Sequence, residues 1–128
     1  MAAVPQAIIK KWAKSTAMQV VGQCEIAHVL LARRTWPSLL KEANVVYWLD
    51  QDAARFALIK GYSPSPGSAD LIGQCAVAEV DLGSCIFFAR VPTDSNVGDP
   101  ASRMNPEGVS AVLPDAVMSP ANLPEWWK

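Results

Sequence analysis

The chain has 128 residues, which is enough for one domain with a modest core but not for two. Its formal net charge of −1 argues against a strongly basic nucleic-acid binder, because phosphate contacts need clustered lysines and arginines. Hydrophobic residues make up 51% of the chain and charged residues 18%, which predicts a folded protein with more apolar surface than one small domain easily hides.

The N-terminal third predicts a short helix, a candidate strand and a long helix. Residues 5–14 start with a proline and have the spacing of an amphipathic helix with its lysines toward water. Residues 16–21 could form a short strand. The pattern over residues 23–43 predicts a long helix that stops at Asn44, with a break or a new first turn at Trp36 and the proline after it.

The central part predicts two parallel strands linked by helices, and hence an α/β fold. Residues 45–50 are apolar and β-branched until they end in an acid, and residues 85–91 are almost continuously hydrophobic, as buried parallel strands are. Between them we expect one helix over residues 52–60 and a second from a cap at Ser68 to Leu82. This order predicts a right-handed crossover unit.

Residues 1–105 are expected to form the domain and residues 106–128 an extended tail. Four prolines in the tail, at positions 106, 114, 120 and 124, are too many for a regular element. The last residues, 123–127, include a leucine and two tryptophans and are apolar enough to dock on this domain or on a neighbour.

The three cysteines are odd in number and widely spaced, which argues against a disulfide framework and predicts a reducing, intracellular compartment whose organelle stays open. Cys24 and His28 lie four residues apart, as two metal ligands on a helix can. Because the chain has a single histidine and no Cys-x-x-Cys pair, small buried thiols are the preferred interpretation over structural zinc. Residues 1–11 lack the apolar core of a signal peptide, and no apolar run approaches the ~18 residues of a membrane span.

Three acids stand out as candidate metal ligands: Glu25 in the first turns of the long helix, Asp50 at the strand end and Asp99 in the last loop. Carboxyl ends of strands are where open α/β sheets bind ligands, and hard cations such as Mg²⁺ need several oxygens at one place. Each acid also has a structural explanation, as a charge near a helix start, a helix cap and a turn residue respectively. Spacing alone leaves both interpretations open.

Three blocks of the sequence resemble the ribonuclease H-like domains of retroelement (retrotransposon) reverse transcriptases. Residues 19–27, with Gly-Gln-Cys-Glu-Ile-Ala, resemble the helix that bears the family's glutamate. Residues 48–63 resemble the family's Asp-Asn-x-Ala-Ala … Leu-x-Lys-Gly-x-Ser segment, and residues 88–103 its closing Val-Pro-Ser-x-x-Asn-x-x-Asp-x-x-Ser-Arg signature. The blocks occur in the family's order and span most of the chain.

By this resemblance Glu25, Asp50 and Asp99 are catalytic, metal-ligating positions, and the family reaction is Mg²⁺-dependent hydrolysis of the RNA strand of an RNA/DNA hybrid. The family's fourth acid, an aspartate on its first strand, has no counterpart before Glu25, and Gln51 replaces the usual asparagine. The resemblance therefore implies an incomplete, N-terminally truncated ribonuclease H-like fold.

Without the family's first strand, residues 45–49 would form an exposed hydrophobic edge, which soluble proteins avoid. We therefore expect other protein chains to cover this edge and the tail residues 123–127. The expected function is that of a non-catalytic structural or accessory subunit of a larger protein complex. The alternatives are a magnesium-dependent nuclease, bound to nucleic acid, whose missing aspartate comes from a partner chain, and a small α/β interaction module unrelated to nuclease chemistry.

Overall fold

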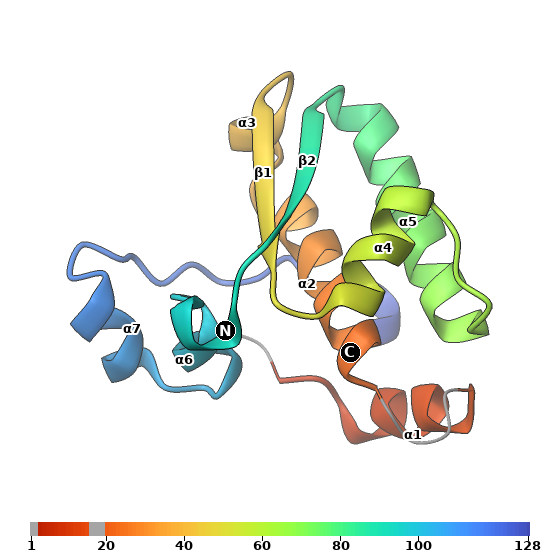
Figure 1. Ribbon diagram of the computed structural model, residues 1–128, viewed down its shortest axis with the longest axis horizontal. Coiled ribbons are helices and arrows are strands. Elements are labelled where there is room, and N and C mark those ends of the chain that lie inside the picture. The colour runs from red at the N-terminus through yellow and green to blue at the C-terminus, as the bar shows by residue number, and fades with distance from the viewer. Residues whose placement is uncertain (1–2, 16–19) are drawn as a thin grey trace.

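The computed structural model of the chain describes residues 3–15 and 20–128 (Figure 1). The fold is mixed α/β. In chain order its helices and strands are α1 (Gln6–Ser15), α2 (Val21–Thr35), α3 (Pro37–Leu40), β1 (Asn44–Leu49), α4 (Asp52–Lys60), α5 (Pro66–Leu82), β2 (Cys85–Arg90), α6 (Asp99–Ser102) and α7 (Pro106–Val112), with single 3₁₀ turns at Thr93–Ser95 and Glu125–Trp127. The expected N-terminal helix is confirmed as α1. The candidate strand over residues 16–21 falls largely on residues 16–19, which lie outside the described part, and Val21 begins α2.

The two strands are parallel and form an open sheet, as the sequence predicts. They pair in register from Asn44 opposite Cys85 to Leu49 opposite Arg90. Helices α4 and α5 connect them, and together with α2 these helices lie on one side of the strands in Figure 1. Among the described residues, helices therefore cover one face of the sheet, and Val46, Trp48 and Phe87 on the other face are exposed.

Helix α2 lies at the centre of the hydrophobic core. Its apolar residues recur with helical spacing and pack against α4, α5 and the buried end of β1. The most deeply buried members of this core are Trp12, Ile26, Ala27, Val29, Leu30, Leu49, Ala54, Leu71, Cys75 and Trp127. Because Glu25 belongs to the same helix, this packing fixes its position relative to the end of β1.

The break or new first turn expected at Trp36 and Pro37 is confirmed, and it divides the helix expected over residues 23–43 into two. Helix α2 ends at Thr35, and Pro37 begins the separate short helix α3. The residue before a proline avoids helical dihedrals, and Trp36 accordingly has φ −123° and ψ 50°. The chain then turns at Glu42, whose φ is +55°, and enters β1.

The start of α5 also differs from the prediction. The helix begins at Pro66 with Ser65 as its N-cap, and Ser68 is buried inside it instead of capping it. Proline is well suited to the first helical position, because the N–H that it lacks would have no partner there. Within the described residues, no helix is both long and apolar enough to cross a bilayer.

The segment expected to be an extended tail begins with helix α7. The side chain of Asn105 accepts a hydrogen bond from the N–H of Gly108 at 2.9 Å, and Pro106 occupies the first turn of the helix. The chain then runs without regular structure until its last residues return to the domain, and Trp127 is only 3% exposed. Its indole N–H donates to the carbonyl of Ala3 at 3.2 Å. The tail thus docks on its own domain, and the expectation that another chain buries this tryptophan is wrong.

Candidate functional site

The carboxyl ends of the two strands bring Asp50 and Asn96 together. Asp50 follows β1 directly, and Asn96 lies in the loop that follows β2. The Nδ2 group of Asn96 donates a hydrogen bond to Oδ2 of Asp50 at 3.2 Å. Because the strands are parallel, both residues emerge at the same edge of the sheet, as the strand order predicts.

Glu25 is close enough to Asp50 for the two carboxyl groups to interact electrostatically. Burial, followed by the negative charge of Asp50, raises the pKa of Glu25 to about 7. One turn further along α2, burial lowers the pKa of His28, while the charge of Asp50 opposes that change. The charge of Asp50 therefore acts on two side chains of α2, Glu25 and His28.

Asp99 is connected to this site through Asn96. It begins α6, and its backbone N–H donates to the carbonyl oxygen of Asn96 at 3.0 Å. Its carboxylate forms an ion pair with Nε of Arg103 at 2.8 Å, four residues further along the chain. A chain of two hydrogen bonds through Asn96 thus links Asp99 to Asp50, while the carboxylate of Asp99 forms its ion pair with Arg103.

The donor atoms of this site are oxygens, the ligand type that Mg²⁺ prefers. A partly buried carboxyl group whose pKa is raised by burial and by a nearby carboxylate, as that of Glu25 is, is an electrostatic setting in which a bound cation is favourable. Across residues 3–15 and 20–128, however, no group of three or more His, Cys, Asp or Glu side chains could hold a metal ion. Glu25 and Asp50 could thus contribute to a magnesium site, and further ligands would have to come from elsewhere.

A hollow of about 310 Å³, lined by both polar and apolar residues, lies where the N-terminal parts of α2, α4 and α5 converge, and its lining includes Gln51, the residue after Asp50. Its polar lining is uncharged and consists of Gln23, Gln51, Ser63, Ser65 and Ser68. Gln23 is buried and donates to the hydroxyl of Ser65 at 3.3 Å, and the side chain of Gln51 caps α4 by accepting from the N–H of Ala54 at 2.6 Å. Helix N-termini favour negative charge, so this hollow is electrostatically suited to an anion.

Sequence reasoning missed this hollow, because its lining comes from three helix starts and one loop. Two features of the sequence could have pointed to the hollow. One is the uncharged, serine-rich segment before α5, and the other is the apolar Val20 before α2, which leaves that helix start without a polar side-chain cap. A loop composition alone does not reveal that three helix N-termini meet.

A buried arginine is the second feature that the sequence did not identify as a site. Arg33 is 3% exposed, and Nη1 donates to the carbonyl of Cys75. Its Nη2 lies 3.6 Å from Oε2 of Glu79, and its guanidinium carbon lies 5.6 Å from the ring centroid of Tyr47. Arg33 follows the apolar helical spacing of α2, which was the available signal for its burial.

Comparison with protein-family models, with curated proteins and with solved structures finds no match for this chain. What the site does must therefore follow from its geometry, its charges and its sequence motifs.

Proposed function

We propose that the chain is a ribonuclease H-like domain of retroelement origin that serves as a structural or accessory subunit of a larger protein assembly. The three sequence blocks support this ancestry, and so does the arrangement of their acids. Glu25 and Asp50 are neighbours in space, and Asn96 of the third block is hydrogen-bonded to Asp50 at 3.2 Å.

The observation that carries the structural role is the open face of the sheet. Val46, Trp48 and Phe87 are 50%, 64% and 67% exposed on this face, and Val46 is opposite Phe87 in the strand register. Within the described residues the sheet has two strands, so the outer edge of β1 has no strand beside it. Two strands form a marginal sheet, and an exposed cluster of large apolar side chains marks a contact surface. We assign this surface to another protein chain.

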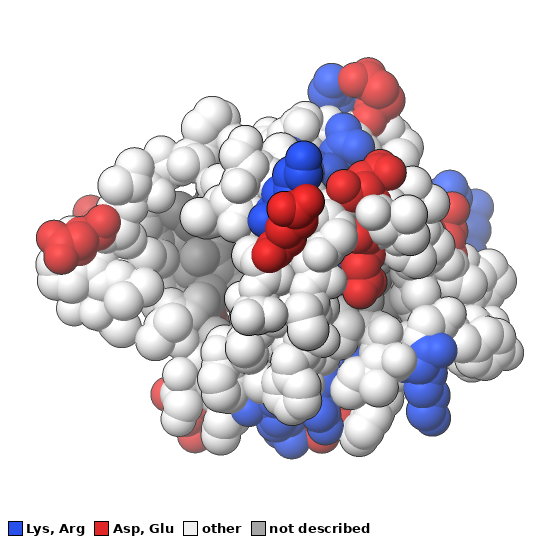
Figure 2. Space-filling model, turned by 90° about the horizontal axis from the view of Figure 1, so that it is seen from above, with Lys and Arg blue, Asp and Glu red and all other residues white. Residues whose placement is uncertain are grey.

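The carboxyl groups support a non-catalytic role for the chain on its own. Two-metal hydrolysis needs several carboxylates from different elements around a pair of cations. Glu25 and Asp50 supply two, and Asp99 is paired with Arg103. The face shown in Figure 2 is mostly uncharged, with lysine and arginine interspersed among acids, and it offers no continuous basic surface for a nucleic-acid backbone.

The raised pKa of Glu25 favours a second candidate, a magnesium-dependent ribonuclease H whose missing aspartate comes from a partner strand beside β1. In this candidate Glu25 and Asp50 hold the cation, which would supply charge stabilisation to the reacting phosphate. Asn96 fixes the orientation of Asp50, and the neighbouring uncharged hollow accepts a backbone phosphate.

A cleavage assay separates the two candidates. The full chain is incubated with a labelled RNA/DNA hybrid and Mg²⁺, alone and with a synthetic β-hairpin peptide that carries a central aspartate; the same hairpin with asparagine is the control. The structural role predicts no cleavage above that of the Asp50→Asn variant in any mixture. Cleavage that needs both the aspartate hairpin and Asp50 would establish the nuclease instead, and cleavage by the chain alone would contradict both candidates.

A further inference from the structure

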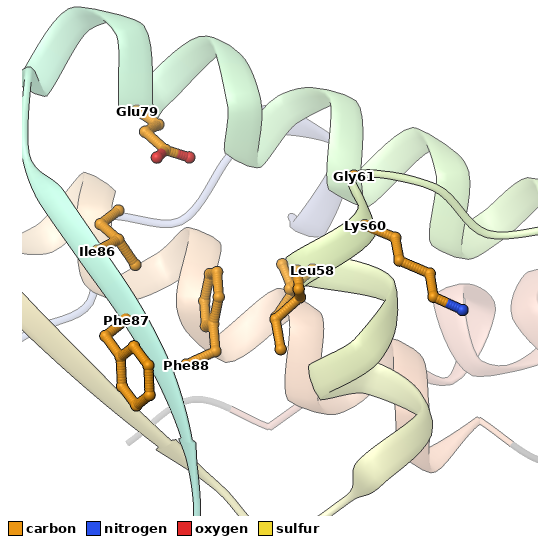
Figure 3. A pocket seen from close by; sticks show the side chains of 8 residues that line it. Leu58, Lys60, Gly61, Glu79, Ile86, Phe87 and Phe88 are labelled. Atoms are coloured by element: carbon orange, nitrogen blue, oxygen red, sulfur yellow. The ribbon is translucent and has the colours of Figure 1, made fainter.

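A groove of about 440 Å³ lies along the outer edge of β2, on the opposite side of the sheet from the free edge of β1. Its walls come from the C-terminal part of α4, from α5 and from β2 itself (Figure 3). The residues that line it include Leu58, Ile59, Glu79, Ile86, Phe87 and Phe88, and among these the Phe87 side chain points away from Leu58 and Phe88. The groove is thus a separate feature from the carboxyl pair at Glu25 and Asp50.

The backbone of β2 presents unpaired hydrogen-bonding groups to this groove. On the inner side, the N–H of Cys85 donates to the carbonyl of Ala43, and the N–H of Val91 donates to the carbonyl of Leu49, each at 2.9 Å. Residues alternate in a parallel ladder, so Ile86, Phe88 and Arg90 direct their N–H and C=O groups to the outer edge. Within the described part of the chain, no hydrogen bond reaches these groups. The edge can therefore accept one more strand.

The side chains around this edge are apolar, with one acid at the end of the groove. Figure 3 shows Phe88 of β2 and Leu58 of α4 pointing toward each other across the groove, and the carboxylate of Glu79 pointing into it from α5. Lys60 points away from the groove. The side chain of Glu79 is 45% exposed, and its Oε2 is the oxygen that faces Arg33, so Oε1 remains for a ligand.

Helix electrostatics add to the negative character of this end. Helix α4 ends at the groove, where Gly61 is one of the lining residues, and a helix C-terminus carries partial negative charge. The groove consequently complements a segment that is apolar along its length and positively charged at one position.

We infer that this groove binds an extended peptide segment of a partner protein, which adds a strand to the outer edge of β2 and places a lysine or arginine beside Glu79. In this mode the main-chain hydrogen bonds supply affinity, and alternate side chains supply specificity. An apolar side chain of the peptide enters between Leu58 and Phe88, and the cation two positions along meets Glu79. This inference goes beyond the proposed function, which concerns the edge of β1 and the open face.

The test uses the ¹⁵N-labelled full chain and a blocked eight-residue peptide of alternating valine and threonine with one central lysine. NMR titration should shift the amide signals of Ile86 and Phe88. A peptide with glutamate in place of the lysine should bind about tenfold more weakly, a difference of about 1.4 kcal/mol, because the change removes a partly exposed ion pair with Glu79 and places a like charge beside it. A peptide N-methylated at alternate residues should lose binding, because it cannot pair with the edge.

Two chain variants provide a matched comparison. Ile59→Lys adds a positive charge at the rim of the groove, where Ile59 is 53% exposed, and should weaken binding of the lysine peptide. Leu39→Lys adds the same charge on α3, where Leu39 is 74% exposed, and should leave binding unchanged.

Equal binding of the lysine and glutamate peptides, or signal shifts confined to β1 and the open face, would overturn the assignment. The same follows if no peptide binds at millimolar concentration. Concentration-dependent shifts of Ile86 and Phe88 without peptide would mean that a second copy of this chain occupies the edge, which also refutes a foreign peptide as its partner.

Discussion

Glu25 carries the electrostatic signature of the candidate site, because its carboxyl group is partly buried and faces the charge of Asp50. These two causes, burial first, raise its pKa from 4.5 to about 7. Neutral pH thus lies close to the midpoint of its ionisation in the folded chain, and a proton or a cation at this position changes the stability of the fold.

This raised pKa predicts that stability falls as the pH rises from 5 to 8. The folded chain keeps the Glu25 proton up to about pH 7, whereas the unfolded chain releases it near pH 4.5, so ionisation in this window favours unfolding. Allowing for partial exposure, we expect Glu25 to contribute a loss of about 1–2 kcal/mol in the free energy of unfolding. Urea unfolding of the wild type and of Glu25→Gln at pH 5 and pH 8 measures this contribution.

The Glu25→Gln variant should have the flatter pH dependence and should be the more stable protein at pH 8. Glu107→Gln, an equivalent change at an exposed position on α7, should keep the wild-type dependence. If the unfolding free energies of the Glu25 and Glu107 variants depend on pH in the same way, folding does not raise the pKa of Glu25.

The sequence predicts part of the chemistry at this scale. The motifs predict that Glu25 and Asp50 belong to one site, and in the fold the charge of Asp50 contributes to the raised pKa of Glu25. The pairing of Asp99 with Arg103 was not predicted, although the four-residue spacing on a helix permits it. The partners of Arg33 come from α5 and β1, so its environment depends on tertiary packing that helical periodicity does not specify.

At the scale of elements, the return of the C-terminal segment ties the two ends of the chain together. Trp127 is buried in the core, and Trp126 packs edge-on against Trp12 of α1 with ring centroids 6.5 Å apart. The indole N–H of Trp126 also donates to Oε1 of Gln74 on α5 at 2.9 Å. The last turn of the chain is therefore part of the core and holds α1 and α5 together.

We expect Trp127→Ala to lower the free energy of unfolding by about 3–5 kcal/mol, because a fully buried tryptophan leaves both lost burial and a cavity. Trp36→Ala is the matched control, since Trp36 is 45% exposed, and it should cost much less. Thermal and urea unfolding followed by circular dichroism compare the two. Equal losses would mean that the docked tail does not contribute to the core.

Helices and strands with strong periodicity were predictable, whereas the helix starts at Pro66 and Pro106 were not. The strands and helix α4 match their predicted ranges within one residue. Pro66 and Pro106 were interpreted as parts of loop and tail, yet each stands at the start of a helix. Sequence composition marks a proline as a boundary but does not say on which side of it the helix lies.

At the scale of the molecule, the fold buries one face of its sheet and leaves the other exposed. The parallel unit was predictable, because the two apolar runs and the intervening helices admit few topologies. The place of the tail was not, because the contact of Trp127 with Ala3 joins residues 124 positions apart. Because the tail docks on its own domain, the surfaces that we assign to partner chains are the open sheet face and the strand edges.

The central claim is that Val46, Trp48 and Phe87 form a surface that another protein chain covers. Sedimentation velocity of the isolated full chain tests it most directly, with Trp48→Lys as the probe and Trp36→Lys as the control at an exposed tryptophan outside the two strands. We predict that the wild type and the Trp36 variant associate into species larger than a monomer, and that Trp48→Lys suppresses this association. A stable, monodisperse monomer for the wild-type chain would contradict the account.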